Sequence, residues 1–471
     1  MDTDICFRSA RELATAIRHR EISSREVVAA HLERIEAVNP DVNAVVTVTG
    51  ERAEDAARVA DERIAAGEPI GPLHGLPIAH KDTHLTAGIR TTFGSLAMQD
   101  HVPDEDELLI ERMRWAGAIT TGKTNVPEFA AGAHTFNSVF GATRNPYDLT
   151  KTAGGSSGGA AAGLATGMHP LADGSDMGGS LRYPAAFCNV VGLRPSPGRV
   201  PSHPTQAAWS TLGVQGPMAR TVGDVALLLS AIAGPDARSP IALEEPGQTF
   251  AASLDRELTG LRVAWSPDLG GTATVDPVVT RTLEPQIKVF EDLGCHVEQD
   301  SPDFSGADEV FRTLRAWQFE LTLGPVLDRA RELLKPSLVW NIEQGRALTG
   351  PDIARAEALH TALYHRMREF FDRYDVLLLP VSQVPPFDVD LEYPTDIAGT
   401  PQQTYLDWMR SCCHISATGN PALSVPAGFT PDGLPLGLQL VGRHRGDFEL
   451  LQIGHAYEQA TGFARYQPAL A

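Results

Sequence analysis

Cysteine is scarce in this sequence, and its placement excludes two common ways of stabilising a fold. There are only five cysteines, and they are scattered along the chain. They are Cys6, Cys188, Cys295, Cys412 and Cys413. An odd number of cysteines without a Cys-x-x-Cys pair favours neither a disulfide framework nor a zinc site.

Long apolar runs and positive charge are also lacking. The N-terminal segment has no apolar stretch typical of a signal peptide, and no run is long enough for a membrane-spanning helix. The formal net charge at pH 7 is −20, which argues against binding to nucleic acid or to an anionic membrane. The sequence therefore predicts a soluble cytoplasmic protein with no nucleic-acid partner and no membrane partner.

Strand-like and helix-like stretches alternate along the whole chain. Hydrophobic residues make up 42 % of the 471 residues, enough to bury a sizeable core. Strands are expected at 43–48, 261–265, 375–380 and 437–441, and the segment 304–348 is expected to be helical. This alternation predicts an α/β fold: a single large domain with a central mixed β-sheet covered by helices on both faces.

Two glycine-flanked serine turns are the most distinctive feature of the sequence. The first is Gly-Gly-Ser-Ser-Gly-Gly at 154–159, and the second is Gly-Gly-Ser at 178–180. Glycine permits positive φ and close approach of the backbone to a ligand. A hydroxyl on such a loop, beside free N–H groups, suits nucleophilic attack and oxyanion binding. A tightly packed helix of small residues is expected directly afterwards, at 160–165.

Other chemistries of glycine-rich turns fit less well. The first turn is followed by alanines and not by the Lys-Ser/Thr of a P-loop, and the dinucleotide-binding fingerprint is absent. A Ser-His-Asp triad is disfavoured because no histidine carries a matching local motif. Lysine is the other candidate base. Lys81 ends a short apolar strand, and Lys123 is its rival in a polar turn.

Several motifs together resemble the amidase signature family of serine hydrolases. The match is strongest in AGGSSGG at 153–159 and in GSDMGGSLRYPAAFCNVVGLRPSPGRV at 174–200. Further matches are GLPIAHKD (75–82), GKTNVPEF (122–129), FGATRNPYD (140–148) and GNPALSVPAGFTPDGLPLGLQLVG (419–442). The resemblance implies one amidase domain over 1–471, with a catalytic core region at 75–200. It leaves 240–400 as a variable, mostly helical substrate-pocket region.

The resemblance also implies a Ser–cis-Ser–Lys triad. Lys81 matches the family's base, Ser156 the bridging serine with a cis peptide bond, and Ser180 the nucleophile. The two serines are 24 residues apart, which fits the family. Lys123 and Ser157 are then assigned structural roles.

This triad is chemically reasonable without the family name. A serine needs a base, and Lys81 can be that base only when burial or nearby donors lower its pKa from about 10.4. Ser156 can accept one hydrogen bond and donate another, and so relay the proton. The backbone N–H groups of Met177, Gly178, Gly179 and Ser180 are the expected oxyanion donors. No metal or cofactor is required.

Other residues near these turns have predicted roles. Asp176 and Arg182 are expected to form an ion pair that braces the nucleophile's turn. The candidate pocket walls are Phe136, Tyr183, Trp209 and Trp408. His80 and Asp173 stand where the family more often has small or apolar residues, so they leave the local polarity, and with it the pH optimum, open.

The resemblance implies hydrolysis of a carbon–nitrogen amide bond. The product acid and amine would form through an acyl-enzyme on Ser180. The expected partner is a small-molecule amide, either an aryl or alkyl amide or a carbamate, and a homodimer is compatible with the family. The alternative is the A subunit of a glutamyl-tRNA(Gln) amidotransferase, which hydrolyses glutamine. Tyr183 and the sequence at 201–204 both depart from that subunit's pattern and favour the stand-alone hydrolase.

Overall fold

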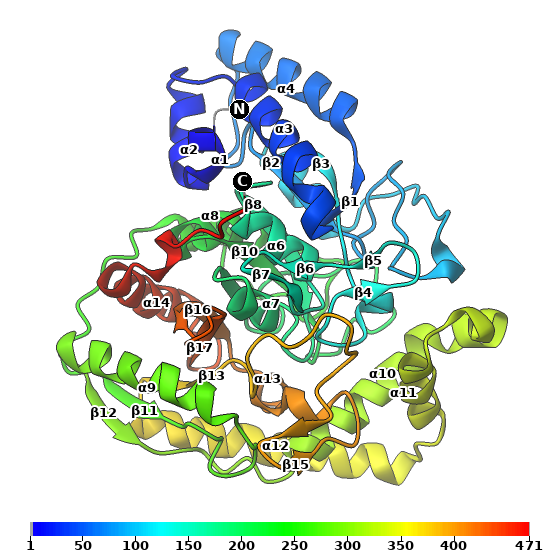
Figure 1. Cartoon of the computed structure of the whole chain (residues 1–471), viewed down its shortest axis with the longest axis vertical. Helices are drawn as coiled ribbons and strands as arrows, with labels where there is room; N and C mark the ends of the chain where they lie inside the picture. Colours follow the sequence, from blue (N-terminus) through cyan, green and yellow to red (C-terminus); the bar gives the residue numbers. More distant parts are fainter. Residues whose placement is uncertain (1–2, 471) are drawn as a thin grey trace.

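A computed structural model describes residues 3–470, and one large mixed β-sheet runs through it (Figure 1). The sheet has eleven strands in the order β1-β3-β2-β8-β10-β9-β16-β17-β13-β11-β12. Their bounds are β1 Val45–Val48, β2 Pro77–Lys81, β3 Ile119–Thr124, β8 Leu171–Asp176, β9 Val191–Arg194, β10 Val214–Ala219, β11 Arg262–Trp265, β12 His296–Gln299, β13 Val376–Pro380, β16 Ala422–Phe429 and β17 Pro435–Val441.

Parallel pairing is confined to two separate parts of the sheet. Strands β3, β2 and β8 run parallel to one another, as do β13, β11 and β12. The strands between these groups pair antiparallel, and β1 is antiparallel to β3 at the edge. Three short hairpins lie outside the main sheet, formed by β4 (Phe136–Asn137) with β5 (Gly141–Ala142), β6 (Arg144–Asn145) with β7 (Asp148–Thr152), and β14 (Asp396–Ile397) with β15 (Thr400–Pro401).

Fourteen α-helices surround the sheet within the described residues. They are α1 Thr3–Phe7, α2 Ala10–Arg18, α3 Ser24–Val42, α4 Gly50–Ala65, α5 Leu108–Trp115, α6 Gly158–Ala165, α7 Arg182–Phe187, α8 Val222–Ile232, α9 Pro277–Asp292, α10 Ala307–Ala330, α11 Pro336–Arg346, α12 Gly350–Arg373, α13 Arg410–Thr418 and α14 Asp447–Thr461. In Figure 1, α1–α4 gather at the top beside β1–β3, and α10 and α11 lie together at the lower right.

Strand β13 shows that helices cover both faces of the sheet. Val376 and Leu378 pack in one hydrophobic cluster with α8, α9 and α14, whereas Leu377 and Leu379 pack in another with α10, α12 and α13. Successive side chains of a strand point to opposite faces, so the two sets of helices lie on opposite sides. The predicted fold class is confirmed. None of the helices within residues 3–470 is long and apolar enough to cross a membrane.

Helix α6 contains the predicted run of small residues, and its packing explains their size. Every residue of α6 is buried, and the helix contacts β8, β2 and β3. A Cβ at Gly159 would lie 2.3 Å from the backbone nitrogen of Asn125 and 2.5 Å from the Ala44 oxygen. A larger side chain at this position would push the helix away from the sheet, together with the serine turn that precedes it.

The segment 304–348, predicted to be helical, forms two helices. Helix α10 ends at Ala330 and α11 begins at Pro336, with extended backbone at Leu334 and Lys335 between them. A proline disfavours helical backbone at the residue before it, so Lys335 caps the second helix instead of continuing the first. The two helices pack against each other as a hairpin.

Candidate active site

Lys81 is the last residue of β2, and its side chain is fully buried. Its Nζ donates hydrogen bonds to the hydroxyls of Ser156 at 2.7 Å, Ser157 at 3.0 Å and Ser175 at 3.0 Å. These serines come from the turn before α6 and from β8, next to β2 in the sheet. The sheet therefore brings the lysine to a cluster of hydroxyls that lie far from it in the sequence.

The two serine turns lie against each other. The Gly155–Ser156 peptide bond is cis, and the Ser157 N–H donates to the Ser180 carbonyl oxygen at 3.2 Å. Ser156, Ser175 and Ser180 line one cavity of about 260 Å³. Lys81, Ser156 and Ser180, which the sequence placed in a triad, thus lie at one site, with Ser156 in contact with the lysine.

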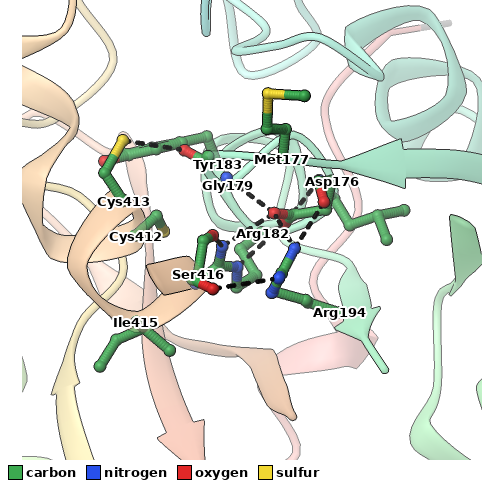
Figure 2. Close-up of polar contacts among 12 residues, drawn as sticks. Asp176, Met177, Gly179, Arg182, Tyr183, Arg194, Cys412, Cys413, Ile415 and Ser416 are labelled. Atoms are coloured by element: carbon green, nitrogen blue, oxygen red, sulfur yellow. Dashed lines mark hydrogen bonds and ion pairs between the residues drawn. The ribbon is translucent and has the colours of Figure 1, made fainter. Parts of the chain in front are cut away.

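The predicted Asp176–Arg182 ion pair is present next to the second serine turn, at 178–180 (Figure 2). Arg182 Nη2 donates to Asp176 Oδ1 at 2.8 Å, and Nε donates to Oδ2 at 3.0 Å. Arg194, which the sequence analysis did not single out, donates to the Asp176 carbonyl oxygen at 2.5 Å. Burial alone would raise the pKa of Asp176, but the two guanidinium groups hold it well below its usual range. The carboxylate is therefore ionised and braces the turn.

The predicted oxyanion donors are not equivalent. The Gly179 N–H donates to Asp176 Oδ1 at 2.8 Å, so this donor is already engaged. The N–H groups of Met177, Gly178 and Ser180 donate to no acceptor within residues 3–470. Gly179 has φ of +109°, and a Cβ there would lie 2.4 Å from the Tyr183 ring. Glycine suits the positive φ of position 179, and the turn leaves three N–H groups available beside the cavity.

Burial gives Lys81 an unusual protonation equilibrium. It lowers the pKa of Lys81 to about 7, although the carboxylates of Asp176, Asp173 and Glu107 raise it. A substantial fraction of the amine is therefore neutral near pH 7. A neutral lysine surrounded by hydroxyls can accept a proton from one of them.

The rival Lys123 lies on the neighbouring strand β3 and is also buried. Burial lowers the pKa of Lys123 to about 8, although Asp82 raises it. Its Nζ donates to the His84 carbonyl oxygen at 2.5 Å and to the hydroxyls of Thr86 at 2.8 Å and Thr91 at 3.1 Å. Lys123 does not line the cavity of Ser180.

A polar cluster behind Lys81 contains the two unusual residues of the sequence. Asp173 accepts the backbone N–H of Lys81 at 2.9 Å, and its oxygens lie 2.6 Å from His80 Nδ1 and 2.8 Å from His84 Nδ1. Burial alone would raise the pKa of Asp173, but the two histidines hold it well below its usual range. His84 was missed by the sequence analysis, because nothing in its local pattern marks it.

The cavity beside Ser180 is lined by apolar and polar residues in similar measure. Its apolar lining includes Phe129, Met177, Val214, Phe319 and Met409, and its polar lining includes Ser202, Thr205, Gln215, Arg315 and Gln318. Among these, sequence reasoning singled out Met177 for its backbone and Ser202 as part of the segment 201–204. A larger cavity of about 780 Å³ lies elsewhere and contains none of the triad residues. No group of His, Cys, Asp or Glu side chains in the described chain is placed to hold a metal ion.

The aromatic residues predicted as pocket walls lie outside the cavity lining of residues 3–470. Trp209 is 78 % exposed at the surface. Tyr183 and Trp408 are buried behind the nucleophile's turn, with ring centroids 5.0 Å apart. Phe136 lies under the Lys335 ammonium, which is 5.1 Å from its ring centroid. A role for these side chains in substrate binding stays a prediction.

This chain belongs to the amidase family, whose sequence model matches residues 26–451. An acylamidase from Rhodococcus erythropolis is 36 % identical over 475 residues, covering 99 % of this chain and 98 % of that protein. The A subunit of the glutamyl-tRNA(Gln) amidotransferase from Carboxydothermus hydrogenoformans is 38 % identical over 495 residues, covering 99 % of this chain and 100 % of that protein. Family membership confirms the resemblance and makes the chain a C–N amide hydrolase.

A solved structure agrees with this assignment. A bacterial aryl acylamidase of the amidase signature family has a TM-score of 0.92 and 30 % identity to this chain, covering 98 % of this chain and 97 % of the other. Its likeness extends over the whole fold and not only over the serine turns. The relatives carry two different activities at similar identity, so family membership by itself leaves the substrate open.

Proposed function

We propose that this protein is a stand-alone hydrolase of small amides, with Ser180 as nucleophile, Ser156 as proton relay and Lys81 as base. The contact that carries this proposal is the 2.7 Å hydrogen bond between Lys81 Nζ and Ser156 Oγ, next to a cavity that Ser156 shares with Ser180. A buried lysine of lowered pKa in contact with a serine is the arrangement that nucleophilic catalysis without histidine needs.

Acylation begins when Ser180 Oγ attacks the amide carbon. Its proton passes to Ser156, whose own proton passes to Lys81. The tetrahedral oxyanion accepts hydrogen bonds from the free N–H groups of Gly178 and Ser180. The proton then returns through Ser156 to the amide nitrogen, the C–N bond breaks and the amine leaves. An ester with Ser180 remains.

Deacylation repeats these transfers with water as the nucleophile. Water adds to the ester carbon and gives its proton to the Ser156–Lys81 pair. The oxyanion collapses, the carboxylic acid is released, and the proton returns to Ser180. Each half-reaction restores Lys81 to its neutral form, so the chemistry needs only the amine, the two hydroxyls and the N–H donors.

Aryl or alkyl amides are the proposed substrates, with carbamates as a further class. The apolar lining from Phe129, Val214, Phe319 and Met409 supports an apolar group next to the scissile bond. Similarity to proteins named acylamidase and aryl acylamidase supports the same class. A cytoplasmic location and a homodimer stay predictions from the sequence.

The second candidate is the A subunit of a glutamyl-tRNA(Gln) amidotransferase, which the similarity to such a protein favours. Against it stand Tyr183 and the sequence Pro-Ser-His-Pro at 201–204. Part of that segment, Ser202 and Pro204, lines the cavity beside Ser180, so its departure from the amidotransferase pattern bears on substrate binding.

The test is product release by the purified chain, without any partner, from aryl amides, alkyl amides, carbamates and glutamine. Ser180→Ala is the matched control, because it removes only the nucleophilic oxygen. Turnover of an anilide by the wild type and its loss in Ser180→Ala would support the stand-alone hydrolase. Glutamine hydrolysis alone, with no turnover of any other amide, would overturn that choice in favour of the amidotransferase component.

A further inference from the structure

One cation in the cavity beside Ser180 lacks a charged partner. Arg315, on α10, lines the cavity and is only 3 % exposed. Within the described part of the chain, its guanidinium donates to Asn341 Oδ1 at 3.0 Å, to the Tyr405 hydroxyl at 2.9 Å and to Met177 Sδ at 3.2 Å. All three acceptors are neutral, and no described carboxylate lies within ion-pair distance.

Arg315 also retains unused donors. A guanidinium has five N–H groups, and the three contacts above leave two of them without an acceptor in the described chain. One of the three contacts is to a thioether, which is a weak acceptor. The Phe319 ring stacks against the group, with its centroid 4.1 Å from Arg315 Cζ, and holds the guanidinium in place.

Two other buried arginines of this protein have a carboxylate partner. Arg182 is paired with Asp176, and Arg199 is paired with Asp447. Arg220 forms no ion pair within residues 3–470, but it donates to three backbone carbonyl oxygens. A buried cation without a counter-charge is costly unless something else supplies one. At Arg315 the open side is the cavity where the substrate is proposed to bind.

We propose that Arg315 is a specificity-determining residue that binds a carboxylate of the substrate. The preferred substrates are then amides that carry a second, ionised carboxyl group on the acyl or the amine part. Charge-assisted hydrogen bonds from the two spare N–H groups match the two oxygens of a carboxylate. This inference rests on the proposed amide hydrolysis by Ser180 and names a substrate class for the same site.

The experiment compares pairs of anilides that differ only by a carboxylate. Glutaric acid monoanilide and valeranilide place the carboxylate or a methyl group on the acyl chain. The pair of 4-acetamidobenzoate and 4-methylacetanilide does the same on the amine part. We expect wild-type kcat/KM to favour the charged member of one pair at least about 30-fold. The pair that shows the preference identifies the part of the substrate that Arg315 contacts.

Arg315→Gln should remove this preference: kcat/KM for the favoured charged anilide should fall at least about 30-fold more than kcat/KM for its neutral partner. Arg312→Gln is the matched control on the same helix, because Arg312 pairs with Asp308 and Asp407 and does not line the cavity. It should retain the wild-type preference. If Arg315→Gln fails to fold, competitive inhibition of valeranilide hydrolysis by glutarate, weakened by Arg315→Lys and by salt, tests the same contact in folded protein.

Two outcomes would overturn the inference. One is equal kcat/KM within each pair together with no inhibition by glutarate. The other is an equal loss on charged and neutral anilides in Arg315→Gln, which would assign Arg315 to holding α10 against α11. Both outcomes keep hydrolysis of neutral anilides and so leave the proposed function standing. Absence of turnover on all four anilides would instead count against the proposed function.

Discussion

Two buried lysines on neighbouring strands have different surroundings, although both have lowered pKa values. In the pairing of β2 with β3, Lys123 lies opposite His80, the residue before Lys81. Successive side chains of a strand alternate between faces, so the one-residue offset sends the two amines to opposite faces of the sheet. Burial lowers the pKa of Lys81 to about 7 and that of Lys123 to about 8. Burial therefore does not distinguish a catalytic lysine from a structural one.

The partners of the two amines make the difference. Lys123 donates hydrogen bonds to a backbone carbonyl and two buried threonine hydroxyls. None of these groups lines the cavity, so Lys123 has no route for proton transfer to a substrate there. Lys81 contacts Ser156 and Ser175, which line the cavity that also contains Ser180. A lowered pKa becomes useful for catalysis when a proton donor lies between the amine and the substrate.

The largest expected effect is the contrast in activity between Lys81→Met and Lys123→Met. Lys81→Met should lower kcat/KM for an anilide by about 10³-fold or more, because Ser180 loses its base. For Lys123→Met, kcat/KM per folded molecule should stay within about tenfold of the wild-type value. Steady-state kinetics on proteins with matching circular dichroism spectra measures both. Similar losses in the two variants would break the distinction between the lysines.

The next effect is on stability and has the opposite order. Lys123→Met removes the hydrogen bonds that Lys123 donates to a buried carbonyl and two buried hydroxyls, so the free energy of unfolding should fall by about 2 to 4 kcal/mol. Lys81→Met should change it by less than about 1 kcal/mol, because cavity water can solvate the serines that remain. Thermal and urea unfolding report both values. A larger loss in Lys81→Met would contradict the structural role given to Lys123.

The pH dependence of kcat/KM sharpens the comparison further. Because Lys81 must be neutral to accept a proton, activity should be low where it is protonated and rise with pH through about 7. Titration of Lys123 should cause no second rise in kcat/KM. Folded Lys123→Met should keep the wild-type midpoint of the pH–rate profile. Initial rates between about pH 5 and 9 test this expectation. Activity that falls as pH increases through this range would exclude Lys81 as the base.

The smallest effect concerns the acceptors around Lys81. Ser157 accepts a hydrogen bond from the Lys81 ammonium at 3.0 Å, which favours the charged form. Ser157→Ala should therefore lower the pKa of Lys81 and move the midpoint of the rate profile to lower pH, by less than about one unit. Thr91→Val removes the equivalent acceptor from Lys123 and should leave that midpoint unchanged. An equal shift in both variants would show that the profile does not report Lys81.

Local sequence pattern predicted much of the fold and missed part of its centre. The apolar stretch at 375–380 contains β13, because a strand buried on both faces needs apolar residues throughout. Strands β8 and β10 were not predicted. They contain Asp173 and Gly174, and Gly216 and Pro217, which are residues of low strand propensity. Hydrogen bonding to the neighbouring strands on both sides stabilises β8 and β10. The local sequence carries no signal of this pairing.

The candidate site divides in the same way. Lys81, Ser156 and Ser180 could be proposed from the sequence because each lies within a motif whose residues are close together in the chain. Ser175 and Arg315 could not, because their roles depend on contacts with residues 94 and 138 positions away, Lys81 and Met177. The sequence by itself determined the fold class and marked the serine turns and a candidate lysine, since these features are recognisable within a few residues. Only the tertiary structure decided which buried charges find a counter-charge and which face a cavity, because burial and electrostatic pairing depend on distances in space and not along the chain.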